Sequence, residues 1–133
     1  MADQNASYSV FEAGPFRQLD KGKQFLKDSL NLNSMEVSLN SLPPGGQFPF
    51  LHKHKENEEL YLIIHGQGQF QVDGNIFPVQ EGSSIRIAPE GVRSLRNTSQ
   101  EQHLEFIVIQ AQQHSLKQWV STDGIPLEEP ITW

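Results

Sequence analysis

The residues with the clearest chemical potential are two histidines and a glutamate near the middle of the chain. His52 and His54 stand two residues apart, and side chains at that spacing on an extended strand point to the same face. Four polar residues, 55–58, separate them from Glu59 and suit a turn that returns the chain antiparallel. Two imidazoles and one carboxylate can hold a divalent metal ion, such as Fe, Mn, Zn or Ni, and leave positions open for substrate or water.

A simpler interpretation is that both histidines lie on the surface beside lysines and that Glu59 faces water. However, Glu59 directly precedes the most apolar run of the chain, Leu60–Ile64, where an inward carboxylate is costly unless it is paired, protonated or bound to metal. Tyr61 shares the side of Glu59 and is a candidate catalytic residue that donates a hydrogen bond or a proton. Core packing is the alternative role for Tyr61.

The spacing of these residues resembles the first motif of the cupin superfamily, G(x)5HxH(x)3–4E(x)6G. Gly46, His52, His54, Glu59 and Gly66 match that motif at every interval. The resemblance extends over residues 35–111. It implies an all-β fold, a double-stranded β-helix or jelly-roll barrel, with the metal in its interior.

The second cupin motif, G(x)5PxG(x)2H(x)3N, is matched less well. Gly82 is followed by six residues before Pro89, and Asn97 comes one residue early. Counted from Pro89, the third histidine of the family falls on Ser94, and a serine hydroxyl is a poor ligand for a borderline divalent metal. Three interpretations stay open: a three-ligand site with more open positions, a site in which Ser94 holds a water, or a barrel without metal.

Two hypotheses of function follow from the resemblance. The first is a metal-dependent enzyme of the dioxygenase or isomerase type, which acts on a small polar substrate held by Ser94, Arg86 and Arg96, with Arg93 in the same local group of arginines. The second is a non-catalytic cupin that binds a small molecule or acts as a sensor without metal. The sequence leaves open whether the protein is an enzyme.

The elements that must position these side chains are short strands separated by turns, a pattern typical of an all-β barrel or sandwich. Asp73-Gly74 between two alternating runs indicates a tight hairpin, since a type I′ turn needs positive φ at both central residues. Residues 24–30 could form a turn or two of helix. Strands are expected at about 35–42, 59–65, 67–72, 76–79, 83–88, 92–96 and 103–111.

A chain of 133 residues with 36% hydrophobic residues is expected to form one domain. We expect an N-terminal arm and short strand or turn at 1–33, whose first 22 residues hold no catalytic group. The barrel core is expected at 34–112, and a C-terminal extension that packs on the barrel at 113–133.

Composition excludes several classes of partner and site. The net charge of −6 argues against nucleic acid, and the absence of cysteine excludes disulfides and thiolate ligands. The apolar runs are too short to span a membrane and the polar N-terminus does not resemble a signal peptide, so a cytoplasmic protein with a small-molecule ligand is expected. Because Leu60–Ile64 is apolar on both faces, either the N-terminal arm or a second subunit must cover it, and we favour a homodimer.

Overall fold

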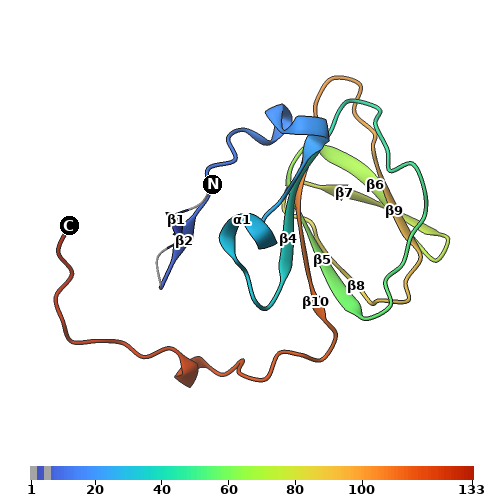
Figure 1. Ribbon diagram of the computed structural model, residues 1–133. Coiled ribbons are helices and arrows are strands. Elements are labelled where there is room, and N and C mark those ends of the chain that lie inside the picture. Colours follow the sequence, from blue (N-terminus) through green and yellow to red (C-terminus); the bar gives the residue numbers. More distant parts are fainter. Residues whose placement is uncertain (1–2, 5–6) are drawn as a thin grey trace.

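Two antiparallel sheets face each other and form a small barrel, and a separate two-stranded sheet lies in the N-terminal arm (Figure 1). The computed structural model describes residues 3–4 and 7–133. Its elements are β1 (Asp3–Gln4), β2 (Ser9–Val10), the 3-10 turns η1 (Phe16–Gln18) and η2 (Asp20–Gly22), β3 (Lys23–Phe25), α1 (Lys27–Leu30), β4 (Glu36–Leu42), β5 (Asn57–His65), β6 (Gln67–Val72), β7 (Asn75–Gln80), β8 (Ser84–Ile87), β9 (Arg93–Asn97), β10 (Leu104–Gln112) and η3 (Ser121–Asp123).

One sheet has five strands in the order β3-β4-β10-β5-β8, and the other has three in the order β7-β6-β9. The expected all-β double-stranded β-helix is therefore confirmed, with strands at each of the seven expected places. The hairpin between β6 and β7 turns at Asp73 and Gly74, with φ of 51° and 84°, as the type I′ turn requires. Within the described residues, α-helix is limited to the four residues of α1.

The core lies between the two sheets because every second residue of the main strands points inward. On β5, Glu59, Tyr61 and Ile63 are buried, whereas Leu60 and Leu62 on the outer face are only partly covered. The buried apolar side chains of both sheets form one cluster: Tyr61, Ile63, Phe70, Val79, Ile87, Leu95, Leu104, Phe106 and Val108.

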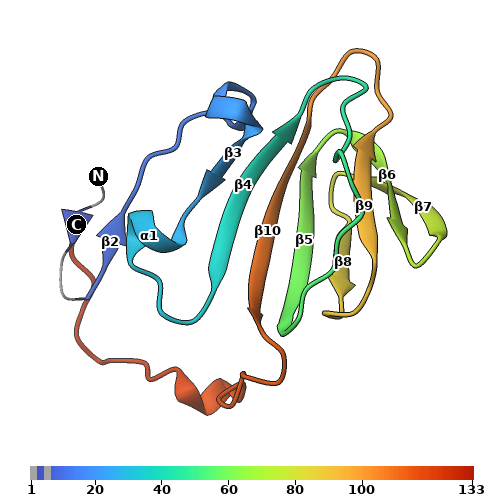
Figure 2. The same ribbon diagram turned by 45° about the vertical axis from the view of Figure 1, so that its right-hand side comes forward.

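The N-terminal arm covers one edge of the larger sheet. Its strand β3 pairs with β4, and the turns η1 and η2 pack against β4 (Figure 2). Gly22 in η2 has φ of 73° and approaches the Ser41 carbonyl so closely that an added Cβ would lie 2.5 Å from that oxygen. The arm is thus fixed beside β4 and does not pair with β5.

The C-terminal segment leaves the barrel. Residues 114–133 are exposed throughout, and Figures 1 and 2 both show the chain running away from β10. The expected packing of this extension on its own barrel is therefore not found. Among the described residues there is no helix with the length and apolar character needed to cross a membrane.

Asn97 fixes the loop between β9 and β10 to the end of β4. Its side-chain amide, which is buried, donates to the carbonyl oxygens of Leu42, Pro43 and Gln102, and its Oδ1 accepts from the Ser99 N–H. A single residue thus satisfies four backbone groups from two segments.

Asn97→Ala should lower the free energy of unfolding by about 1–3 kcal/mol, because it leaves these partly buried backbone groups without partners. Urea unfolding followed by circular dichroism measures this difference. Thr98→Ala, at an exposed neighbouring position, is the control and should stay within about 0.5 kcal/mol of the native chain. Equal stability of the Asn97→Ala variant would contradict the role given to Asn97.

Candidate ligand site in the barrel

The segment that carries the two histidines runs alongside β9 and not beside β5. The His52 N–H donates to the Arg93 carbonyl at 3.1 Å, the Arg93 N–H donates to the His52 carbonyl at 2.9 Å, and the His54 N–H donates to the Pro89 carbonyl at 2.8 Å. Prolines and glycines in 43–49 interrupt regular pairing, so the segment makes isolated bridges instead of a full strand. The backbone thereby places His52 directly opposite Arg93.

His52, His54 and Glu59 converge inside the barrel. One nitrogen or oxygen atom from each lies within 4.8 Å of the others. The His54 Nε2 atom is 3.1 Å from the Glu59 carboxylate, and the two imidazole rings meet edge to face with centroids 5.5 Å apart. The sequence therefore identified three side chains that the fold brings together.

Arg93 is the fourth side chain that points into the barrel beside these three. On β9, Arg93, Leu95 and Asn97 are buried in alternation, and Ser94 lies between them on the other face. In the second cupin motif the histidine stands four positions before the asparagine, and the residue four positions before Asn97 is Arg93. Compared with the motif, the chain is therefore one residue shorter between Gly91 and β9. The expectation that Ser94 takes the place of the third histidine is therefore wrong. It depends on counting forward from Pro89, and a shift of one residue along a strand moves a side chain to the opposite face of the sheet.

Arg93 is completely buried, with its Nε atom 3.7 Å from the Glu59 carboxylate. Its Nη2 atom donates to the Ala88 carbonyl at 3.0 Å, while Nε and Nη1 are buried without a hydrogen-bond partner. We call His52, His54, Glu59 and Arg93 the inner polar group. A buried guanidinium with two free donors is costly unless a charged partner compensates it, and Glu59 supplies that charge.

The inner polar group does not fit a resident divalent metal ion as it is folded. The donors of His52, His54 and Glu59 are of the right kind and close enough, but the Glu59 carboxylate already faces His54 and Arg93. The charge of Lys23 also acts on Glu59. Two cations around one carboxylate leave a net positive field, which opposes a dication and favours an anion.

A cavity of about 440 Å³ opens beside this group, between the arm, strands β4 and β10 of the larger sheet, and the segment that carries the histidines. His52 forms its inner end, while Lys23 approaches the ring of Phe48, with its ammonium 5.9 Å from the ring centre. Partial burial lowers the pKa of Lys23, against the attraction of Glu59. The residues that line the cavity are Lys21, Gly22, Lys23, Asn40, Ser41, Leu42, Gln47, Phe48, Pro49, Phe50, His52 and Phe106.

The surroundings of His52 favour the neutral form of its imidazole. Burial lowers its pKa, and the positive charges of Arg93 and Lys23 act in the same direction, while Glu59 opposes them. The Nδ1 atom of His52 is buried and has no hydrogen-bond partner. A neutral imidazole with a free nitrogen can donate to or accept from a bound molecule.

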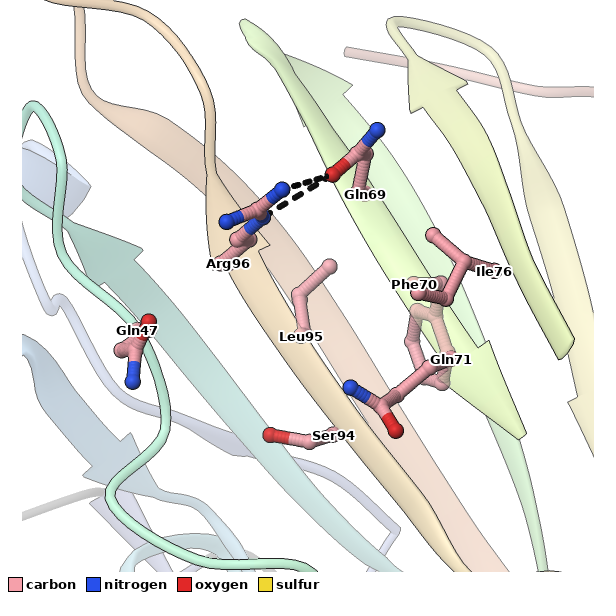
Figure 3. Close-up of a pocket in the computed structure, with 8 residues that line it drawn as sticks. All are labelled: Gln47, Gln69, Phe70, Gln71, Ile76, Ser94, Leu95 and Arg96. Carbon is pink, nitrogen blue, oxygen red and sulfur yellow. Dashed lines mark hydrogen bonds between the residues drawn. The ribbon is translucent and has the colours of Figure 1, made fainter. Parts of the chain in front are cut away.

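The other candidate substrate contacts lie outside the barrel. Ser94 and Arg96 line a shallow groove on the outer face of β6 and β9, where the Arg96 guanidinium donates to the Gln69 side-chain carbonyl (Figure 3). Arg86 on β8 is exposed and lies 3.8 Å from Glu58. None of the three faces the cavity of His52, because each stands on the outward face of its strand.

Comparison with known proteins identifies the family to which this fold belongs. The cupin domain family profile matches residues 38–110, more than half of the chain. The chain belongs to the cupin family. Its fold resembles that of a cupin protein from Bacteroides fragilis, with a TM-score of 0.81 and 34% identity over 92% of this chain and 99% of that one.

Two curated proteins match this cupin over part of its length. An uncharacterised protein from Methanocaldococcus jannaschii is 35% identical over 57 residues, 43% of this chain and 46% of that protein, so the match spans just under half of that relative. An oxalate-binding protein from Thermotoga maritima is 29% identical over 83 residues, 62% of this chain and 67% of that protein.

Sequence reasoning did not assign Arg93 or the arm residues Lys21, Gly22 and Lys23 to the interior site of this cupin. The sequence places Arg93 only in the local group of arginines that could contact a substrate, although the count back from Asn97 is a signal for its inward position. The N-terminal arm also contributes to the cavity, since Lys21, Gly22 and Lys23 of β3 line it, while the absence of a catalytic group from the first 22 residues stays a prediction. No periodicity marks the arm, so nothing in the sequence pairs it with β4.

Tyr61 packs in the core next to the inner polar group. Its ring meets Phe70 edge to face at 4.8 Å and stacks on Phe106 at 6.1 Å. Burial raises the pKa of Tyr61, and the neighbouring Glu59 carboxylate raises it further. Its hydroxyl therefore stays protonated beside Glu59, a position that suits packing and hydrogen bonding more than proton transfer near neutral pH.

The raised pKa of Tyr61 predicts a loss of stability at alkaline pH. The unfolded chain releases this proton above about pH 10, whereas the folded chain retains it, so the stabilisation is present below pH 10 and is lost as pH rises further. The free energy of unfolding should fall by up to about 1.4 kcal/mol per pH unit in this range.

Urea unfolding of the native chain and of Tyr61→Phe between pH 9 and 11.5 measures this slope. The variant should show a shallower fall than the native chain. Tyr8→Phe removes the other, exposed tyrosine and controls for the loss of a phenol as such. Parallel curves for the native chain and Tyr61→Phe would disprove the assignment.

Proposed function

We propose that this cupin binds a small organic carboxylate inside its barrel, with side chains in place of a metal ion. The observation that carries the proposal is the buried guanidinium of Arg93, which occupies the inner face of β9 next to Glu59. A fixed positive charge at this place supplies the attraction for an anion that a metal would otherwise give.

The charges around the cavity support an anionic ligand. Lys23 is held between the rings of Phe25 and Phe48 and has no carboxylate within ion-pair distance among the residues that the structure describes. Lys23 and His52 both line the cavity, whereas Arg93 does not line it but pairs with His52 through the backbone and acts on it through its charge. A ligand carboxylate can therefore accept hydrogen bonds from Lys23 and His52, while the nearby charge of Arg93 adds to the attraction for the anion.

The shape and lining of the cavity favour a ligand with an apolar body. Phe48, Phe50 and Phe106 form much of its wall, and its volume of about 440 Å³ lies within the range of pockets that take drug-sized molecules. Phe48 and Phe106 pack against each other with ring centres 6.0 Å apart and both line the cavity, so they present an aromatic wall to a ligand. We therefore infer an aromatic or similarly flat carboxylate.

The oxalate-binding protein of Thermotoga maritima lends support to carboxylate chemistry, since its name describes a small dianion as ligand. The cavity of the present cupin is much larger than a two-carbon dianion needs. Oxalate is thus the natural comparison ligand, and the apolar wall predicts that it binds more weakly than an arylcarboxylate.

A metal-dependent enzyme of the dioxygenase or isomerase type is the second candidate function. It is favoured by the clustering of His52, His54 and Glu59 donor atoms within 4.8 Å. It requires the Glu59 carboxylate to turn from Arg93 toward the metal, which would leave the buried guanidinium without its partner. The non-catalytic function needs no such rearrangement.

Isothermal titration calorimetry with benzoate, phenylacetate, benzyl alcohol and oxalate tests the carboxylate proposal. The two arylcarboxylates should bind, and neutral benzyl alcohol should bind at least tenfold more weakly, because it keeps the ring and lacks the charge. Lys23→Gln should weaken binding of the arylcarboxylates about five- to tenfold, which corresponds to about 1–1.4 kcal/mol. Lys27→Gln, an exposed lysine paired with Asp28, is the matched control and should bind like the native chain.

Equal affinity for benzoate and benzyl alcohol, or no loss in Lys23→Gln, would refute the proposed carboxylate site. The same titrations with Fe(II), Mn(II), Zn(II) and Ni(II) test the second candidate. Stoichiometric binding that His52→Ala abolishes would favour the metal enzyme, and absence of heat with all four ions would exclude it.

A further inference from the structure

The C-terminal segment 114–133, here called the tail, carries an unusual amount of exposed apolar surface. Seven large apolar side chains in it are 47–112% exposed: Leu116, Trp119, Val120, Ile125, Leu127, Ile131 and Trp133. A run of this kind normally marks a surface that packs against something. None of the residues that the structure describes buries these side chains.

The tail leaves the barrel through a defined turn. After β10 ends at Gln112, the Gln113 N–H donates to the Glu56 carbonyl and the Ser115 N–H donates to the Gln112 carbonyl, with His114 at φ of 64°. This turn directs the chain away from β10, as Figure 2 shows. Twenty extended residues can reach about 65 Å, which is far beyond the barrel of the same chain.

The larger sheet has a matching apolar surface that is also incompletely covered. Ile107 of β10 pairs with Leu39 of β4 and Leu62 of β5, and Ile109 pairs in the same way with Val37 and Leu60. Three strands thus align their outward side chains in two rows, and none of the six is buried in the single chain. We call Val37, Leu39, Leu60, Leu62, Ile107 and Ile109 the outer apolar face.

Part of the tail and part of the N-terminal arm are also matched in a protein of similar fold. The fold match to the Bacteroides fragilis cupin covers 92% of this chain, whereas the barrel at 34–112 is less than two thirds of it. The match must therefore include part of both flanking segments. A tail that lies away from its own barrel and recurs in a relative is expected to have a fixed docking place.

We propose that two copies of this chain form a dimer in which the tail of each copy packs on the outer apolar face of the other. The second copy is the occupant that fits, because each copy offers one exposed apolar tail and one incompletely covered apolar face. The exchange is reciprocal, so one twofold axis completes both contacts. It also covers the outer face of Leu60–Ile64, which the arm leaves open.

Tryptophan fluorescence reports on this contact directly, because both tryptophans of the chain, Trp119 and Trp133, lie in the tail. Emission and acrylamide quenching are measured on the full chain from nanomolar to high micromolar concentration, in parallel with sedimentation velocity. We expect a dimer with shielded, blue-shifted indole emission at micromolar concentration. On dilution, the sedimentation coefficient and the emission should revert together to those of a monomer with exposed indoles.

Three variants locate the two surfaces. Ile125→Asp combined with Leu127→Asp in the tail should raise the dimer dissociation constant at least 100-fold, and Leu62→Asp on the outer apolar face should do the same. Gln118→Asp adds a charge at a polar tail position and is the matched control, which should remain a dimer. Far-UV circular dichroism checks that each barrel is retained.

Several results would overturn the proposal. A monomer at all concentrations, whether its indoles are exposed or shielded, excludes the exchange. A dimer with exposed indoles shows that the tail is not the contact. A Leu62→Asp variant that folds and still dimerises with shielded indoles shows that the tail docks elsewhere.

Discussion

The buried pair of Arg93 and Glu59 is the interaction on which the rest of the site depends. Arg93 stands on β9 of the smaller sheet and Glu59 on β5 of the larger one, so their charges join the two halves of the barrel. Neither charge is stable there alone, since removing one partner of a buried pair costs about 3–5 kcal/mol. The pair therefore fixes both the position of β9 and the polarity of the cavity.

The segments around the Arg93–Glu59 pair supply the other charged and polar side chains at the cavity. The histidine segment bonds to the backbone of Arg93, which brings His52 to the end of the cavity, and His54 takes up a free side of the Glu59 carboxylate. From the opposite wall, the arm brings Lys23 over Phe48. The result is a pocket lined by aromatic rings and by Lys23, with the charge of Arg93 nearby, and this lining is the basis for the proposed carboxylate with a flat apolar body.

Much of this arrangement follows from local sequence rules. Alternation predicts the strands, Asp73-Gly74 predicts the hairpin, and the spacing of His52, His54 and Glu59 predicts their convergence, because each rule acts over a few residues. The inward position of Arg93 depends on a single missing residue before β9, and a shift of one residue reverses every side chain of a strand. Lys23 could not be predicted, since its place depends on pairing between β3 and β4 that no periodic pattern encodes. The course of the tail also could not be predicted, because it is not determined by residues close to it in the sequence.

The central claim is that Arg93 replaces a metal-binding side chain and makes the barrel selective for anions. Elemental analysis by mass spectrometry of the native chain and of Arg93→His, both purified without nickel or chelator and equilibrated with Mn(II) and Zn(II), tests it most directly. The account predicts less than a tenth of an equivalent of metal in the native chain and close to one equivalent in Arg93→His, where a third imidazole replaces the guanidinium. A full equivalent in the native chain, lost in His52→Ala, would contradict it.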